Sequence, residues 1–519
     1  MKANSAAGFW KLAAAYCAGA AALVPLYSRQ IDADGISYIS IAAKYLYGDF
    51  INAVNGYWGP LLSWLLLPFM AIGINPLVAA KIAGALAGLL ALYGAYRLSL
   101  RYEMPEGVRY SVLGTLIPVL YSFFLVVISP DLLVAALLLL CFTLTLEPDF
   151  NASPRKQLAC GALAAAAYYS KSYAMPFFLA YLVLAQLLRF MRAQGDGRTA
   201  VGRAFLRSAI VFGLLCAPWA GFLSAKYGSF TVNTTGAYNH AVVGPGYIGH
   251  PVNSEGFFAP PNLTAVSVWE DPSVIPVRKW SPLSSAKLFG RQLSLLLKNA
   301  FAVFDAYQSV TFFSFAILLC MILFLCGGWD EKWLLPLAAL AIYSAGYMPI
   351  VVRARYLYFC YLVLYVMGAA VLGALFSNEF FTPLRRKLLV AAFAVAMLVS
   401  PLANLIGNFG QGAEMPALAG RLARAADFRG ANIASNTMWM ENLYLSYYLG
   451  ARYFGEERKG ASTQETEKAL RGMGIRYFLL WDDGARPMPG WREIPVPGIL
   501  NLRLLESGTA PAPDRGRQR

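Results

Sequence analysis

Residues 29–50, RQIDADGISYISIAAKYLYGDF, follow directly on a long apolar run and decide how the chain is organised. The segment opens with charged residues, among them Asp32 and Asp34, and then returns to an amphipathic pattern. Ionisable side chains at membrane depth are expensive and by default indicate a functional site. The first question is therefore whether the preceding run, 9–27, crosses a membrane, and which side the aspartates face.

The composition is typical of a membrane protein. Of 519 residues, 58% are hydrophobic and only 14% are charged, too few charges to cover a soluble protein of this size. The net charge of +15 is typical of lysines and arginines gathered on the cytoplasmic side of a multi-pass protein. Because no basic stripe with interleaved aromatic residues is present, we expect no nucleic acid partner.

We predict an α-helical polytopic fold with about eleven membrane spans, each apolar over roughly 17 to 25 residues. The spans are placed at 9–27, 76–98, 109–128, 131–147, 157–170, 173–193, 204–224, 308–327, 333–351, 356–377 and 386–406. The first span lacks the small-residue cleavage site of a signal peptide, so we expect it to be retained as a membrane span. The apolar segment 59–73 is shorter and contains Pro68, so it is predicted to lie in the membrane interface.

The distribution of charge sets the orientation. With segment 59–73 not counted as a span, one side holds the basic loops, which contain Arg97, Arg101, Arg109, Arg155, Lys156, Arg189, Arg192, Arg198, Arg203, Arg207, Arg385, Arg386 and Lys387. This asymmetry puts the amino terminus in the cytoplasm. The remaining ionisable groups, which the excess of basic residues in cytoplasmic loops does not explain, then lie on the outer side. They are Asp32, Asp34, Asp131, Lys171, Arg353 and Arg355. We expect these groups to gather on one surface.

Two further regions are predicted to be outside. Segment 225–307 ends in an amphipathic stretch, 284–304, that is typical of a helix lying in the interface, as are 36–48 and 60–72. After a membrane domain of residues 1–410, residues 411–508 are predicted to form a small extracytoplasmic α/β domain.

Within that α/β domain, strands are expected at 431–435 and 476–481, and a helix at 463–474 that ends at glycine. The tail, 509–519, is predicted to be disordered. All seven cysteines lie in apolar runs and are expected to be packing residues.

Several stretches share their order and spacing with one enzyme class. They are Asp34 with Tyr38, then WGPLLSWLLLPFMAIGINPLVAAKIAGAL (58–86), SPDLLVAALLLL (129–140), ALAAAAYYSKSYAMP (162–176) and RARYLYF (353–359). Over residues 9 to 370 the chain thereby resembles GT-C glycosyltransferases of the protein O-mannosyltransferase and lipid A aminoarabinose transferase class, glycosyltransferase family 39-like. It departs from them at Gly35, where many relatives have a second acid, and in the 225–307 segment and the carboxyl-terminal domain.

The resemblance implies an inverting glycosyltransferase of the inner (plasma) membrane that takes a sugar from a polyprenyl-phosphate donor. The acceptor would be a hydroxyl of a glycan, lipid or protein on the outer face. Asp34 is the candidate base, with Asp131 as the second acidic catalytic position, because a carboxylate in a poorly solvated place can have a useful pKa. The developing phosphate charge needs cations, for which Lys171, Arg353 and Arg355 are the candidates. The candidate substrate-binding residues are Asp32, Tyr38, Trp58 and Tyr356.

The residues also allow simpler roles. Asp32, Asp34 and Asp131 are suited to capping helices, and Lys171 to reaching lipid head groups. Tyr38 and Trp58 are suited to an aromatic belt at the interface.

The sequence also leaves alternatives open for metal binding and for function. His240 and His250 match no metal motif, and no metal site is predicted, although a divalent cation shared by Asp34 and Asp131 stays open. The rival functions are a transporter or flippase of lipid-linked sugar, a polymerase or ligase that uses a lipid-diphosphate donor, and a non-enzymatic assembly subunit.

Overall fold

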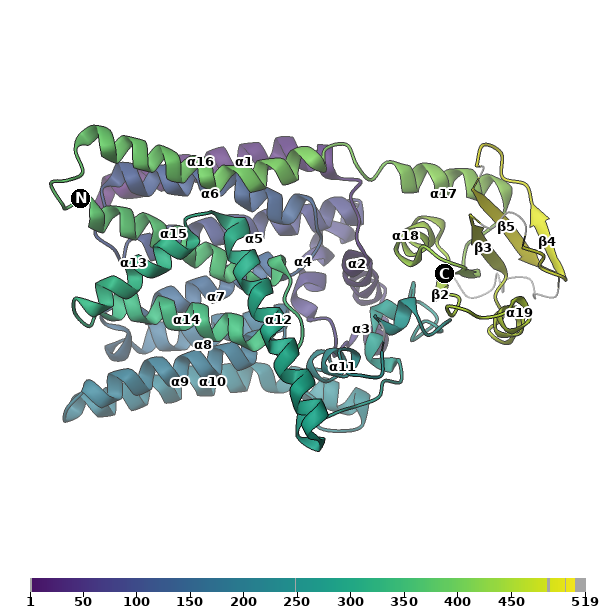
Figure 1. Cartoon of the computed structure of the whole chain (residues 1–519), viewed down its shortest axis with the longest axis horizontal. Coiled ribbons are helices and arrows are strands. Elements are labelled where there is room, and N and C mark those ends of the chain that lie inside the picture. Colours follow the sequence, from purple (N-terminus) through teal and green to yellow (C-terminus); the bar gives the residue numbers. More distant parts are fainter. Residues whose placement is uncertain (1, 248, 483–485, 500, 509–519) are drawn as a thin grey trace.

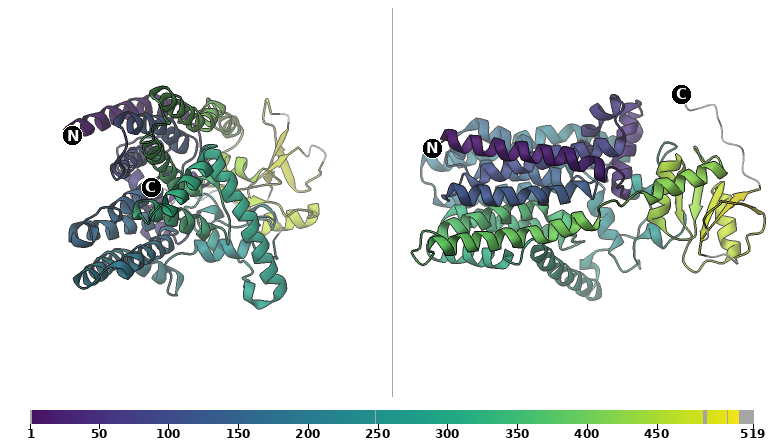
Figure 2. Two further views of the ribbon diagram at one scale, coloured as in Figure 1. Left: turned by 60° about the vertical axis from the view of Figure 1, so that its left-hand side comes forward. Right: turned by 90° about the horizontal axis from the view of Figure 1, so that it is seen from above.

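The computed structural model describes residues 2–247, 249–482, 486–499 and 501–508, and the predicted disordered tail lies outside them. A bundle of long helices carries a small sheet domain at the end opposite the amino-terminal end of α1 (Figures 1 and 2). The bundle helices are α1 (Lys2–Leu23), α5 (Pro76–Ser99), α6 (Glu106–Leu125), α7 (Asp131–Thr145), α8 (Pro154–Ser170), α9 (Ala174–Arg192), α10 (Asp196–Tyr227), α13 (Ser314–Cys326), α14 (Glu331–Tyr347), α15 (Tyr358–Leu375) and α16 (Pro383–Gly407).

Helix α15 is the centre of the bundle. Every residue from Tyr358 to Leu372 is buried, and α5, α6, α7, α13 and α14 all pack against it. A helix surrounded by other helices must be apolar on all sides, which explains why YFCYLVLYVMGAAVL contains no charge.

A helix lies at the position of each predicted span, but not all of these helices are long. Among the described residues, seven helices are long and apolar enough to cross a membrane, or eight if the bent pair α12–α13 is one span. The predicted start of the span 308–327 is wrong. Residues 308–310 continue α12 (Ala286–Val310), and the chain then bends by 99° before α13 begins at Ser314.

Two sets of charged residues mark opposite ends of the bundle. At one end, Glu147 follows α7 and binds Arg97 at 2.8 Å and also Lys156, at the start of α8. Asp131 begins α7 and Lys171 directly follows α8, so both lie at the other end. The loops predicted to be cytoplasmic are therefore separated from the candidate site by the length of these helices.

Short helices cover the end of the bundle that faces the sheet domain. They are α2 (Ala33–Leu46), α3 (Phe50–Ala53), α4 (Pro60–Ala71) and α11 (Thr235–Val242), the last within the outer loop, which we define as residues 228–285. Asp32 caps α2, because its side chain accepts a hydrogen bond from the Gly35 amide at 2.9 Å. The capping role for Asp32 is thus present in the structure.

The carboxyl-terminal domain has a five-stranded sheet in the order β2-β1-β3-β5-β4. Strand β1 is parallel to β2 and β3, whereas β5 is antiparallel to β3 and β4. The elements are α17 (Glu414–Ala425), β1 (Asn432–Ser435), α18 (Trp439–Leu449), β2 (Arg452–Glu456), α19 (Thr463–Gly472), β3 (Tyr477–Trp481), β4 (Trp491–Ile494) and β5 (Leu502–Ser507). The two strands and the helix predicted from the sequence are present.

The outer loop joins this domain to the bundle. It covers the free edge of β2, since the Tyr453 amide donates to Val266 O and the Phe258 amide to Phe454 O, both at 2.7 Å. An edge strand closed in this way is protected from pairing with other chains. Apolar residues of α2, the outer loop and the sheet domain form one continuous core, which includes Ile36, Val268 and Leu443.

A buried ion pair fastens the outer loop to α2. Lys44 Nζ lies 2.7 Å from Glu270 Oε1, and the two side chains are only 2% and 3% exposed. Ser40 Oγ donates to the other carboxylate oxygen of Glu270 at 2.5 Å, and Asn55 Nδ2 donates to the Glu270 carbonyl at 2.6 Å.

Because removing one partner strands the other charge in the interior, we expect Lys44→Met to destabilise the protein by about 3–5 kcal/mol. The double variant Lys44→Met/Glu270→Leu should recover much of that loss, since neither charge remains. Unfolding in detergent, followed by circular dichroism, measures both. Lys298→Met, at an exposed lysine of α12, is the control, and a Lys44→Met protein as stable as this control would contradict the expectation.

Candidate functional site

Four ionisable residues from four separate elements form a continuous chain of contacts. Asp34 is in the first turn of α2, Asp131 is the first residue of α7, Lys171 follows α8, and Arg355 lies in the short 3-10 turn η7 (Ala354–Leu357). Arg355 joins the two acids, with 2.5 Å from its Nη2 to Asp34 Oδ2 and 3.6 Å from its Nε to Asp131 Oδ2. Lys171 Nζ lies 2.6 Å from Asp131 Oδ1. We call these four residues the ion-pair chain.

Aromatic rings flank the cationic part of the ion-pair chain. Lys171 Nζ lies 3.6 Å from the ring centroid of Tyr356 and 5.5 Å from that of Tyr347, and Arg355 lies 5.6 Å from the ring of Tyr356. A cation over a ring face is attracted by the ring quadrupole. Burial lowers the pKa of Lys171, and the adjacent Asp131 carboxylate opposes that effect. Lys171 is therefore held by specific partners and does not simply reach for head groups.

The second oxygen of Asp34 has its own partner. Trp269 Nε1 donates to Asp34 Oδ1 at 3.0 Å, and the Trp269 carbonyl accepts from Trp58 Nε1 at 3.0 Å and from Ser37 Oγ at 3.2 Å. The Trp269 ring packs edge-on against Trp439 of the carboxyl-terminal domain, with centroids 5.6 Å apart. Trp269 thus links Asp34 to the sheet domain through the outer loop.

The other predicted site residues lie at different distances from this chain. Tyr38 is buried and packs edge-on against Trp58, with centroids 5.3 Å apart, so neither forms an exposed aromatic belt. Asp32 uses its carboxylate to accept from the amides of Gly35 and Ile128. Arg353 is exposed, and in the described part of the chain its side chain forms no ion pair, so it stands outside the ion-pair chain.

Sequence reasoning missed two residues near the acids. Trp269 lies deep in the long outer loop, where no local pattern distinguishes it from a packing residue. Lys81 of α5 is fully buried, its ammonium has no hydrogen-bond partner among the described residues, and its charge acts on Asp32. A lysine within the first third of a helix whose other charged residue, Arg97, stands in the last turn was the available signal, because an unpaired buried ammonium is costly.

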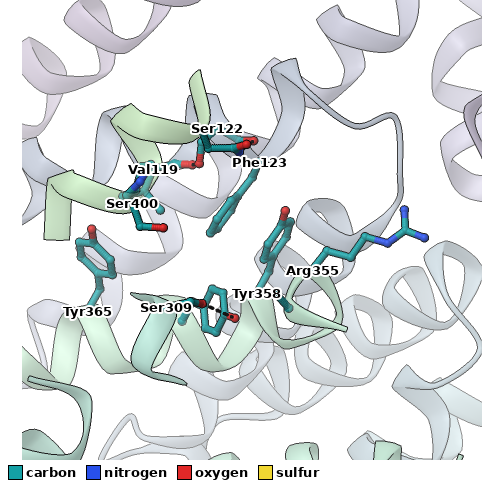
Figure 3. Close-up of a pocket in the computed structure, with 12 residues that line it drawn as sticks. Val119, Ser122, Phe123, Ser309, Arg355, Tyr358, Tyr365 and Ser400 are labelled. Atoms are coloured by element: carbon teal, nitrogen blue, oxygen red, sulfur yellow. Dashed lines mark hydrogen bonds between the residues drawn. The ribbon is translucent and has the colours of Figure 1, made fainter. Parts of the chain in front are cut away.

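A groove of about 290 Å³ opens beside Arg355 (Figure 3). Its walls come from α6, the end of α12, η7, α15 and α16, and Tyr358 stacks on Phe123 with centroids 3.6 Å apart. The lining is mainly aromatic and aliphatic with a few hydroxyl and amide groups: Val119, Ser122, Phe123, Ser309, Ala354, Arg355, Tyr358, Tyr361, Tyr365, Ser400, Pro401 and Asn404. The Arg355 side chain runs away from the other labelled lining residues, with its guanidinium on the far side of Tyr358 (Figure 3), so the groove itself can take an apolar chain.

The structure gives the histidines packing roles. His240 stacks on Trp280 with centroids 4.6 Å apart, and His250 packs edge-on against Trp269 at 5.0 Å. Burial lowers the pKa of His250 to about 4. Within the described ranges, no group of three or more His, Cys, Asp or Glu side chains is placed to hold a metal ion.

The possible cation shared by Asp34 and Asp131 meets a specific obstacle. The Arg355 guanidinium already stands between the two carboxylates, in contact with an oxygen of each. A bridging metal ion would require Arg355 to leave that position.

The fold is shared with solved membrane proteins, although no protein-family model and no curated protein sequence matches the chain. ArnT from Cupriavidus metallidurans bound to undecaprenyl phosphate is similar with a TM-score of 0.56 at 13% identity, over 95% of this chain and 97% of that one. The apo state of that protein gives 0.56 at 15% identity, over 96% and 98%. The Archaeoglobus fulgidus oligosaccharyltransferase in complex with Zn and sulfate gives 0.54 at 13% identity, over 88% of this chain and 64% of that one.

These similarities establish the GT-C fold predicted from the sequence. The apolar helices and the shared fold together make the chain a multi-pass membrane protein.

Asp32 provides a prediction about stability and pH. Burial and the charge of Asp34 raise the pKa of Asp32 to about 6, partly opposed by the two amides and Lys81. Because an unfolded aspartate titrates near pH 4, the folded state holds this proton more tightly, and the contribution of Asp32 to stability falls as the pH rises from about 4 to about 6.

The variant Asp32→Asn lacks that titration. Its melting temperature relative to the wild type should therefore be higher at pH 7 than at pH 4, as differential scanning fluorimetry in detergent can measure. An equal difference at both pH values would contradict the assignment.

Proposed function

We propose that the chain is an inverting glycosyltransferase that moves a sugar from a polyprenyl-phosphate donor to an acceptor hydroxyl on the outer face of the cytoplasmic membrane. The observation that carries the proposal is the ion-pair chain, in which Arg355 joins Asp34 and Asp131 beside an apolar groove. A fold shared with ArnT, which has been captured with undecaprenyl phosphate, supports a lipid-linked donor.

Each residue of the ion-pair chain has a role in the proposed reaction. The acceptor hydroxyl gives its proton to Asp34 while its oxygen attacks the anomeric carbon from the face opposite the phosphate. The bond from the anomeric carbon to the phosphate oxygen breaks, and its electron pair stays with the polyprenyl phosphate. Arg355 and Lys171 stabilise that charge, the arginine with a planar pair of donors that matches a phosphate.

The resting contacts are compatible with these roles. Each carboxylate oxygen of Asp34 accepts one strong hydrogen bond, from Arg355 or from Trp269. A carboxylate has about four lone-pair positions, so a place for the acceptor hydroxyl remains. Asp131 balances Lys171 and Arg355 before the donor arrives, which keeps two cations together without mutual repulsion.

Replacing the base should nearly abolish transfer. We expect Asp34→Asn to lower turnover by about 10²–10⁴-fold, because general base catalysis contributes about that much. Transfer from a labelled polyprenyl-phosphate sugar, with the protein in nanodiscs, measures the loss. Asp305→Asn, at an exposed acid of α12, is the matched control, and near-normal turnover of Asp34→Asn would refute the assignment.

Trp269 should act as a positioning residue for Asp34. Trp269→Phe keeps an aromatic ring but removes the N–H donor, so we expect kcat to fall about tenfold to a hundredfold with little change in KM for the donor. Trp280→Phe removes an equivalent donor elsewhere in the outer loop, from the hydrogen bond to His240 O, and serves as the control. A loss of kcat equal in both variants would mean that Trp269 has no special role.

The donor class has its own test. Mass spectrometry of a strain that lacks the gene should show accumulation of a polyprenyl-phosphate sugar and loss of a sugar from an outer glycan. In the purified reaction the lipid product should be the monophosphate. Release of polyprenyl diphosphate would instead support a polymerase or ligase. Loss of the sugar from the outer glycan, with lipid-linked sugar redistributed and not accumulated, would support a flippase.

A further inference from the structure

A second cavity, of about 320 Å³, lies where three distant parts of the chain meet. The last turns of α2 supply Lys44 and Tyr47, the outer loop supplies Thr264, and the carboxyl-terminal domain supplies Ser446 and Arg452. Lys44 and Ser446 are buried at the bottom, whereas Tyr47 and Thr264 are exposed at the rim. The cavity is therefore open to ligands and is lined by polar groups from all three parts.

The two cations in this cavity differ in how their charge is balanced. Lys44 is neutralised by Glu270, as described above. Arg452 has only uncharged partners: its Nη1 lies 3.2 Å from Asn432 Oδ1, its Nη2 lies 3.5 Å from Asn262 O, and its guanidinium lies 5.5 Å from the ring centroid of Phe454. Throughout the described residues no carboxylate lies within 4 Å of its guanidinium, and its buried Nε has no acceptor.

This arrangement has an energetic cost that a ligand can remove. Burial lowers the pKa of Arg452, which shows that its surroundings disfavour the charged form. A half-buried arginine normally has an anionic partner, because an unpaired charge is expensive to desolvate. The acid at the rim, Asp49, is already hydrogen-bonded by Asn52 and Thr264.

We propose that this cavity binds an oxyanion, a phosphate or carboxylate group, and that Arg452 is its main ligand. The site is separate from the ion-pair chain. Lys44 follows Asp34 by ten residues on the same helix, which corresponds to about 15 Å. The inference holds whether or not the chain transfers sugar.

Two sources can supply such a group. The rim continues into exposed apolar side chains at Tyr47, Phe50 and Ile51, which suits the head group of an anionic lipid. A soluble anionic ligand has the same access from the solvent. Both present the same oxyanion to Arg452.

Calorimetric titration of inorganic phosphate into the full chain in zwitterionic nanodiscs tests the site. An Arg355→Gln background removes the main competing phosphate contact. We expect Arg452→Gln to weaken phosphate binding about tenfold or more, because a hydrogen-bonded charge is lost. Arg424→Gln, at an exposed arginine of α17, should bind as the parent does. Equal binding by the two variants, or an equal loss in both, would overturn the proposal.

A second variant guards against misfolding of Arg452→Gln. Ala43→Leu adds bulk to the lining of the cavity while leaving the Arg452 side chain in place, and it should also weaken phosphate binding. Unchanged binding would overturn the proposal.

A final arm separates the two sources. In nanodiscs that contain phosphatidylglycerol, a lipid occupant would compete with phosphate and raise its apparent Kd in the parent but not in Arg452→Gln. An unchanged Kd in the parent would assign the cavity to a soluble anion. Loss of transfer in Asp34→Asn bears on the proposed function alone and leaves this test intact.

Discussion

The contact of Arg355 with two carboxylates is the constraint on which the rest of the site depends. Asp34 and Asp131 come from different helices, and two acids so near each other in a poorly solvated place would repel unless a cation lay between them. The guanidinium removes that repulsion, and Lys171 completes the balance of two acids and two bases. Four elements far apart in the sequence thereby meet at one point, beside the groove that Arg355 also lines.

Much of this arrangement could be predicted because helix ends are visible in the sequence. Asp34, Asp131 and Lys171 each stand where an apolar run begins or ends, and the positive-inside asymmetry then puts them on one side. Arg353 was grouped with Arg355 on the same reasoning. Arg353 is the extended residue that precedes η7, whereas Arg355 lies within that turn, and only Arg355 reaches the acids.

Trp269 escaped prediction because its contact with Asp34 is long-range. Trp269 reaches Asp34 from a loop whose next residue, Glu270, is anchored by a buried ion pair to Lys44, more than two hundred positions away in the chain. No local periodicity encodes such a pairing. The start of the span predicted at 308–327 was misplaced because residues 308–310 continue the amphipathic run of α12, and a composition window does not locate the bend that follows.

The brevity of α7 has a consequence for the membrane itself. A helix of 15 residues covers about 22 Å, whereas the hydrocarbon layer is about 30 Å thick. If the Glu147 end sits at one boundary of that layer, Asp131 lies several ångströms beneath the other. On the proposed function, the ion-pair chain then lies in a sunken basin, and the phosphate of a lipid donor would have to descend below the plane of its neighbours to reach Arg355.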